Sequence, residues 1–125
     1  MAKINLISNI ENKWGLGKDI RLIYDLLTPN HSISVEHWDR QPGRQADLNI
    51  HLELVGGLHF RRTTKNVFIP NPEWMLAQWV KRKRRFDVTL AKTRFNEAVL
   101  NNLGFRNVVY TGFTSEDRYE PVDAE

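Results

Sequence analysis

Residues that could hold a ligand follow a short apolar segment near the start of the chain. Residues 4–8, Ile-Asn-Leu-Ile-Ser, lead into a loop with a Gly-x-Gly pattern and then into an amphipathic segment. A strand, a glycine loop and a helix in this order aim backbone N–H groups at an anion, and glycine lets the backbone approach it closely. The residues of this loop that we predict to contact a ligand are Asn9, Lys13, Trp14, Gly15 and Gly17. The third glycine of the dinucleotide fingerprint is absent, so an ordinary surface loop is the alternative.

Two residues of a later apolar segment have side chains suited to acid–base chemistry. His51 and Glu53 are two positions apart in a strand predicted over residues 48–54, so they share one face of it. A histidine next to a carboxylate can orient a substrate hydroxyl or take up its proton. His51 and Glu53 are therefore the candidate catalytic residues, and the solvated face of an edge strand is the alternative.

Two further loops carry candidate substrate-binding residues. Asn71 and Glu73 belong to a Pro-Asn-Pro-Glu segment, which is also typical of a rigid turn that opens a helix. Lys92 and Thr93 precede a predicted helix, where a cation and backbone N–H groups could hold a phosphate. The alternative for Thr93 is a helix cap without a ligand.

These residues need a scaffold that brings them together, and the hydrophobic pattern predicts one. The expected strands cover residues 3–8, 33–37, 48–54, 66–69, 86–91 and 107–110, and the expected helices cover residues 18–27, 72–84 and 93–103. The first helix has an apolar stripe that we expect to be buried, formed by Ile20, Ile23, Tyr24 and Leu27. This order predicts an α/β fold, a three-layer sandwich with a mostly parallel sheet and the first strand at its centre. Right-handed crossovers then place the carboxyl ends of all strands on one edge, where such sheets bind ligands.

The composition limits the class of protein. The chain has 125 residues, 41% of them hydrophobic and 26% charged, which fits a single soluble domain. It has no cysteine, which excludes disulfides and thiolate metal sites, and we expect neither a metal site nor a cofactor. No apolar run approaches the roughly 18 residues of a membrane span, and the N-terminus lacks the apolar core of a signal peptide. We therefore expect a cytoplasmic protein.

The formal net charge is +3, and much of the excess lies in one basic run. The run consists of Lys81, Arg82, Lys83, Arg84 and Arg85. It suits an anionic membrane surface, which would place the protein at the inner face of the membrane, and its alternative is a solvated helix end where cations complement the macrodipole. Nucleic acid is disfavoured as a partner because the chain has no recognised nucleic-acid-binding module.

Four stretches of the chain together carry a family resemblance. They are Asn-Leu-Ile-Ser and Trp-Gly-Leu-Gly within residues 5–17, Phe-Ile-Pro-Asn-Pro-Glu-Trp at 68–74, Phe-Asp-Val-Thr-Leu-Ala-Lys-Thr at 86–93, and Val-Tyr-Thr-Gly-Phe-Thr-Ser at 109–115. Over residues 3–118, the chain resembles the N-terminal half of a GT-B glycosyltransferase of the bacterial group-1 type. The resemblance implies a Rossmann-like domain over residues 1–118 and a polar tail over residues 119–125.

In the resembled family, a first Rossmann-like domain mainly binds the acceptor and a second one binds the nucleotide sugar. The chain ends where the second domain would begin, so we expect that domain to be supplied in cis or in trans, with the present chain inactive alone. The implied acceptor is a glycan or a lipid-linked sugar. The alternative is a stand-alone Rossmann-like module that binds a nucleotide or phosphate ligand without catalysis, and the absence of Gly-x-x-x-x-Gly-Lys argues against an NTPase.

Overall fold

The computed structural model describes residues 1–8, 16–53, 58–60, 64–70 and 80–112. These ranges contain six strands, two α-helices and one 3-10 turn. In order they are β1 (Lys3–Ser8), α1 (Leu16–Leu27), β2 (Ser32–His37), β3 (Leu48–Leu52), β4 (Lys65–Ile69), the 3-10 turn η2 (Lys83–Arg85), β5 (Val88–Ala91), α3 (Arg94–Asn102) and β6 (Val108–Tyr110).

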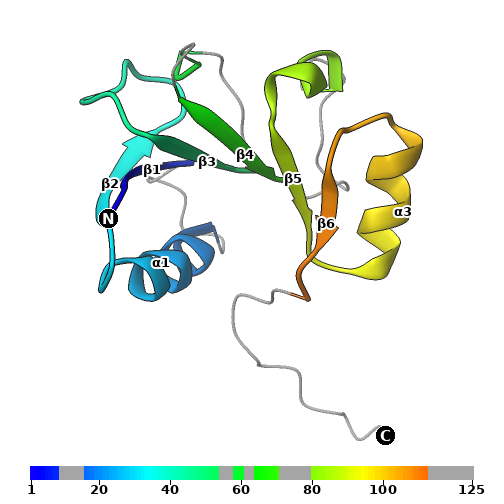
Figure 1. Ribbon diagram of the computed structural model, residues 1–125, viewed down its shortest axis with the longest axis horizontal. Coiled ribbons are helices and arrows are strands. Elements are labelled where there is room, and N and C mark those ends of the chain that lie inside the picture. Colours follow the sequence, from blue (N-terminus) through cyan, green and yellow to red (C-terminus); the bar gives the residue numbers. More distant parts are fainter. Residues whose placement is uncertain (9–15, 54–57, 61–63, 71–79, 113–125) are drawn as a thin grey trace, which may run out of the picture.

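The strands form one parallel sheet of six strands in the order β2-β1-β3-β4-β5-β6 (Figure 1). The first strand is interior, since it pairs with β2 on one side and with β3 on the other. The chain therefore turns outward from β1 to β2, crosses back past β1 to β3, and continues in one direction to β6. The predicted α/β fold with a mostly parallel sheet is confirmed.

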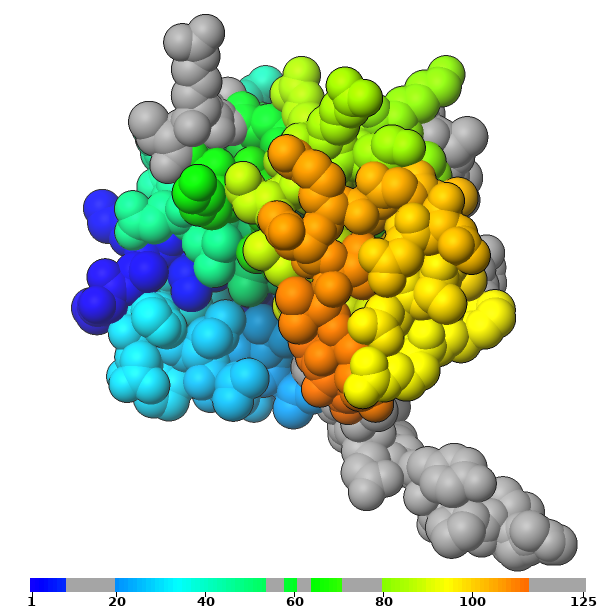
Figure 2. Space-filling model, turned by 45° about the vertical axis from the view of Figure 1, so that its right-hand side comes forward, coloured from blue at the N-terminus to red at the C-terminus, as the bar shows by residue number. Residues whose placement is uncertain are grey.

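The two described helices lie on opposite faces of this sheet and complete three layers. The connection from β1 to β2 contains α1 and runs in one direction along the sheet, whereas the connection from β5 to β6 contains α3 and runs in the other. Right-handed crossovers in opposite directions place their helices on opposite faces. In Figure 2 the edge strand β6 accordingly separates α1 from α3.

The first hydrophobic core lies between α1 and one face of the sheet. Alternate strand residues point to the same face. Those that form this core are Ile4, Leu6, Ile50, Leu52 and Ile69. Ile20 and Ile23 of α1 pack on them, and Leu27 joins as a partly buried residue. Tyr24 was expected in the same stripe but is 38% exposed. At 3.6 residues per turn, Tyr24 lies at the margin of the apolar face of α1, so its side chain is partly exposed to solvent.

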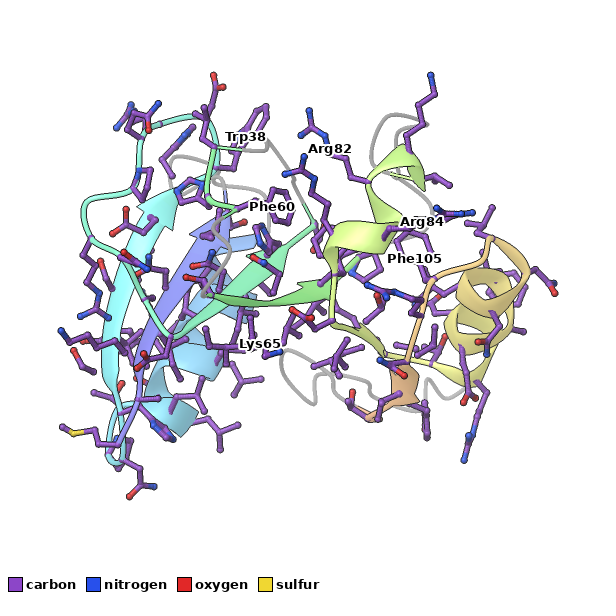
Figure 3. The ribbon with its side chains drawn as sticks, turned by 45° about the horizontal axis from the view of Figure 1, so that its top comes forward. Trp38, Phe60, Lys65, Arg82, Arg84 and Phe105 are labelled. Carbon is purple, nitrogen blue, oxygen red and sulfur yellow. The ribbon has the colours of Figure 1, made fainter. Side chains whose placement is uncertain are left out.

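The second core lies on the opposite face and is aromatic. Phe68 of β4 stacks on Phe86, with ring centroids 4.4 Å apart. Leu100 of α3 and Phe105 close the cluster, and Figure 3 shows Phe105 between β5 and α3. Phe86 is expected in a strand, but β5 begins only at Val88, because the Phe86 backbone N–H donates to the Lys83 carbonyl and so ends the preceding 3-10 turn.

Several other element boundaries differ from the sequence expectation. The helix expected from residue 18 begins at Leu16, and the strand expected over residues 48–54 ends at Leu52. The helix expected over residues 72–84 falls largely outside the described residues. Its end is described, and there Val80 and Lys81 are helical while a tighter 3-10 turn replaces the α-helix at Lys83–Arg85. The expected polar tail lies outside the described residues.

The expected capping of the last helix is confirmed. The Thr93 side chain accepts a hydrogen bond from the Asn96 backbone N–H at 3.0 Å, which satisfies one of the unpaired N–H groups of the first turn of α3. Gly104 follows the helix with a φ of 88°, a conformation that glycine adopts without a steric cost.

Truncation of Leu100 tests the second core. Because Leu100 is fully buried, Leu100→Ala removes contacts and leaves a cavity, and we expect the free energy of unfolding to fall by about 2–5 kcal/mol. Phe95 lies on the same helix but is 74% exposed, so Phe95→Ala should change the free energy of unfolding by less than about 0.5 kcal/mol. Urea denaturation followed by circular dichroism measures both variants, and equal losses would contradict this packing.

Candidate functional site

The carboxyl ends of β1 and β3 mark the topological switch point of the sheet. The chain leaves β1 toward β2 on one side, whereas β3 lies on the other side of β1. Loops diverge above such a point and leave a crevice in which α/β proteins bind ligands. Here the Ser8 hydroxyl donates to the Leu52 carbonyl at 3.1 Å, and the Trp38 backbone N–H donates to the Ser8 carbonyl at 3.0 Å. These bonds tie the carboxyl ends of β1, β2 and β3 together.

Glu53 lies directly beyond β3 at this edge, in a conformation that non-glycine residues rarely adopt. Its φ is 65°, while its backbone N–H still donates to the Ile69 carbonyl at 3.0 Å. A left-handed conformation costs a non-glycine residue about 1–2 kcal/mol, and such residues cluster at functional sites. Because of this left-handed conformation, the Glu53 side chain does not continue the alternation of β3 side chains between the two faces of the sheet.

The Glu53 carboxylate meets Lys92, which follows β5. The Lys92 Nζ and Glu53 Oε2 atoms are 3.7 Å apart, and the two side chains are 20% and 15% exposed respectively. Glu53, predicted as a catalytic residue, and Lys92, predicted as a binding residue, therefore lie together at the carboxyl edge of the sheet. The pair is shielded from bulk solvent but still accessible to it, so it can hold a polar ligand.

Two threonines complete the described part of this edge. Thr93, a candidate binding residue, uses its hydroxyl to cap α3, as its alternative reading predicted. Thr111 follows β6 and bonds back to the Ala91 carbonyl through its backbone N–H at 3.0 Å and its hydroxyl at 3.3 Å. Of the candidate binding residues that the structure describes with their side chains, Lys92 is therefore the one placed to meet a ligand.

His51 is not at the surface of this edge. It is 1% exposed, and its ring stacks on Phe60 at 5.0 Å between centroids and meets Phe86 edge-on at 5.4 Å. The alternative reading, a solvated edge strand, is wrong because β3 lies inside the sheet. The expectation that His51 and Glu53 share a face also fails, because β3 ends before Glu53, and each side chain has its own partner.

The partner of His51 is Asn66 of β4. The His51 Nε2 and Asn66 Oδ1 atoms are 2.9 Å apart, and the same Oδ1 accepts from Asn49 Nδ2 at 3.2 Å. Since an amide oxygen only accepts, we assign the His51 proton to Nε2. Burial lowers the pKa of His51 to about 4, the Asn66 hydrogen bond opposes part of this shift, and His59 adds to it through charge repulsion. His51 is therefore a neutral member of a buried network.

Several predicted site residues lie outside the described residues. They are Asn9, Lys13, Trp14, Gly15, Asn71 and Glu73. Their roles stay predictions. Gly17 lies in the first turn of α1, where the backbone is helical and φ is not positive.

The basic run lies at the opposite edge of the sheet. Residues 81–85 precede β5 and Arg106 precedes β6, so these cations gather at the amino ends of the strands, as Figures 2 and 3 show for residues 81–85 and for Arg82 and Arg84. Arg106 Nη2 donates to the Arg84 carbonyl at 2.6 Å, and Lys83 Nζ donates to the Leu103 carbonyl at 2.9 Å. The expected contact of this run with an anionic membrane stays a prediction. No helix within the described ranges is long and apolar enough to cross a membrane.

Sequence reasoning missed a group of buried polar residues on the face opposite α1. They are Asn5, Asn49, His59, Thr64 and Asn66, and the half-buried Arg44 lies beside them. The sequence signal was an asparagine inside each of three mainly apolar strands, β1, β3 and β4. The described residues contain no cluster of histidine, aspartate and glutamate that could hold a metal ion.

Comparisons of this chain with protein-family models, with curated proteins and with solved structures find no match. Its function therefore has to be argued from the site itself.

The buried state of His51 predicts a pH dependence of stability. Its pKa is about 4 in the folded chain and about 6.5 in the unfolded chain. Below pH 6.5 the unfolded chain takes up a proton that the folded chain does not, so stability falls as the pH drops from 6.5 toward 4. We expect His51 to contribute a loss of about 2 kcal/mol between pH 7 and pH 5.

The measurement is urea denaturation of the wild-type chain and of His51→Leu at both pH values. Leucine has no proton to bind, so this variant should lose about 2 kcal/mol less than the wild-type chain over the same interval. Parallel losses in the two proteins would show that His51 is not held neutral by burial.

Proposed function

We propose that this chain is the acceptor-binding half of a glycosyltransferase, which holds a glycan or lipid-linked sugar while a second domain presents the nucleotide sugar. The proposal joins the resemblance of four sequence stretches to the arrangement of the carboxyl edge. The observation that carries it is the Glu53–Lys92 pair, held 3.7 Å apart beside the switch point of the sheet.

The chemistry of this pair suits a sugar acceptor. A carboxylate accepts hydrogen bonds from hydroxyl groups, and an ammonium donates to them, so neighbouring sugar hydroxyls can bind both groups at once. Hydrogen bonds to charged groups contribute about 1.5–3 kcal/mol, more than bonds between neutral groups. Because the ion pair already orients both side chains, little side-chain entropy is lost on binding.

The same observations weigh against the alternative of a phosphate-binding module. The helix that follows Lys92 is α3, whose N-terminus is capped by Thr93 and carries Glu97 in its first turn. Lys92 faces a carboxylate, which offsets the charge that would attract a phosphate. A polar ion pair without excess charge favours a saccharide over a phosphate.

Glycan binding tests the proposal without the donor domain. The purified chain is applied to an array of immobilised saccharides that includes lipid-linked sugar headgroups, and we expect at least one of them to bind. Glu53→Gln keeps the shape of the side chain and removes its charge, so it should weaken that binding about tenfold, equivalent to about 1.4 kcal/mol.

Asp25→Asn is the matched control, because Asp25 is an exposed carboxylate of α1. It should bind the array as the wild-type chain does. An array without any bound saccharide, or equal binding by Glu53→Gln and the wild-type chain, would contradict the proposal.

A further inference from the structure

A second polar site lies on the sheet face opposite α1, away from the Glu53–Lys92 pair. A cavity of about 210 Å³ is lined there by Asn5, Arg44, Ala46, Asn49 and Thr64, among others. These residues come from β1, β3 and the segments that lead into β3 and β4. At about 30 Å³ per water molecule, the cavity has room for about seven waters or a small organic molecule.

The floor of the cavity is unusual for a parallel sheet, whose faces are normally apolar. Asn5, Asn49 and Asn66 occupy adjacent register positions across β1, β3 and β4, and they are 1%, 2% and 4% exposed. A buried amide without hydrogen bonds costs several kcal/mol, on the order of 1–3 from protein mutations. A row of three such amides therefore needs partners for its polar atoms.

Asn49 has one polar atom without such a partner. Its Nδ2 donates to the His59 carbonyl at 2.7 Å and to Asn66 Oδ1 at 3.2 Å. These two bonds fix the orientation of the amide, because a flipped amide would set its oxygen against two acceptors. Its Oδ1 is buried and has no hydrogen-bond partner among the residues that the structure describes. Asn49 lines the cavity, and its Oδ1 is a buried acceptor that still requires an N–H or O–H donor.

Arg44 supplies a positive charge to the same cavity. Its guanidinium donates to Asn5 Oδ1, Ser32 Oγ, the Ile4 carbonyl and the Ser32 carbonyl, at 2.8–3.1 Å. All four acceptors are neutral, and within the described ranges no carboxylate lies within 4.0 Å of the guanidinium. The charge of this half-buried arginine is thus not neutralised by a direct ion pair, while its four bonds hold it rigid.

We infer that this cavity binds a small anion that also carries hydroxyl groups, such as a short polyol phosphate or a hydroxycarboxylate. The anionic group faces Arg44, whose fifth N–H is not used by the four bonds above. A hydroxyl donates to Asn49 Oδ1. Thr64 donates its own hydroxyl proton to the Ala46 carbonyl at 2.7 Å, so its oxygen can accept a second ligand hydroxyl. The site is independent of the proposed sugar acceptor site.

The test uses four probes in thermal-shift and calorimetric titrations of the whole chain: glycerol 3-phosphate, glycerate, inorganic phosphate and glycerol. At least one of the two hydroxylated anions should bind saturably, at least tenfold more tightly than glycerol and than inorganic phosphate. At a hundredfold excess over its Kd it should raise Tm by on the order of 5–10 °C. Which of the two anions binds better identifies the anionic group as phosphate or carboxylate.

Ala46→Leu separates binding in the cavity from binding elsewhere. Ala46 lines the cavity and is 5% exposed, so a leucine there fills the space without removing Arg44 or Asn49. Its cooperative unfolding without ligand shows that it folds, and we expect its Kd to rise at least tenfold. Arg84→Gln removes an exposed cation at the amino edge, and Glu53→Gln alters the other site, so both should bind the anion as the wild-type chain does.

Three results would overturn the inference. They are the absence of saturable binding by both hydroxylated anions, binding of glycerol or inorganic phosphate as tight as theirs, and unchanged binding in a folded Ala46→Leu variant. Loss of saccharide binding in Glu53→Gln together with intact anion binding would support both sites separately.

Discussion

The parallel pairing of β1 with both β2 and β3 is the constraint on which the rest of the structure depends. Parallel strands cannot be joined by a tight turn, so each connection has to cross a face of the sheet. The connections place α1 on one face and α3 on the other, and they bring all carboxyl ends to one edge. Glu53 and Lys92 meet at that edge although 38 residues separate them in the sequence.

The two faces of the sheet differ in chemistry because different structures cover them. Under α1 the sheet is apolar, as a packed helix requires. On the other face, over β1 and β3, the described cover comes from loop residues such as Arg44 and His59, whose backbone and side chains provide partners for buried asparagines. A helix pairs most of its own backbone N–H and C=O groups, whereas a loop needs outside partners for them. Polar side chains on the sheet face can provide these partners where loops cover the sheet. The polar cavity arises where this cover leaves space.

The fold was predictable from the sequence because its signals are local. The burial of Ile20 and Ile23 in the first helix and the cap at Thr93 each depend on residues a few positions apart, and both are confirmed. The site was predictable only in part. The sequence predicts Glu53 and Lys92 as site residues, but their pairing depends on the order of the strands in the sheet. The alternating pattern also predicts that the third strand continues to residue 54, whereas the left-handed conformation of Glu53 ends it at Leu52. The burial of His51 depends on Phe60 and Phe86, which lie beyond the reach of any local pattern.

Calorimetric titration of the isolated chain with a panel of nucleotide sugars is the sharpest test of the proposal that this chain forms the acceptor side of a two-sided site. A nucleotide held by one wall of a cleft stays largely solvated, and its charged contacts are screened. We expect no more than weak binding, with a Kd on the order of millimolar, equivalent to about −4 kcal/mol. A micromolar Kd for any nucleotide sugar would show that this chain carries the donor site, and would contradict the assignment.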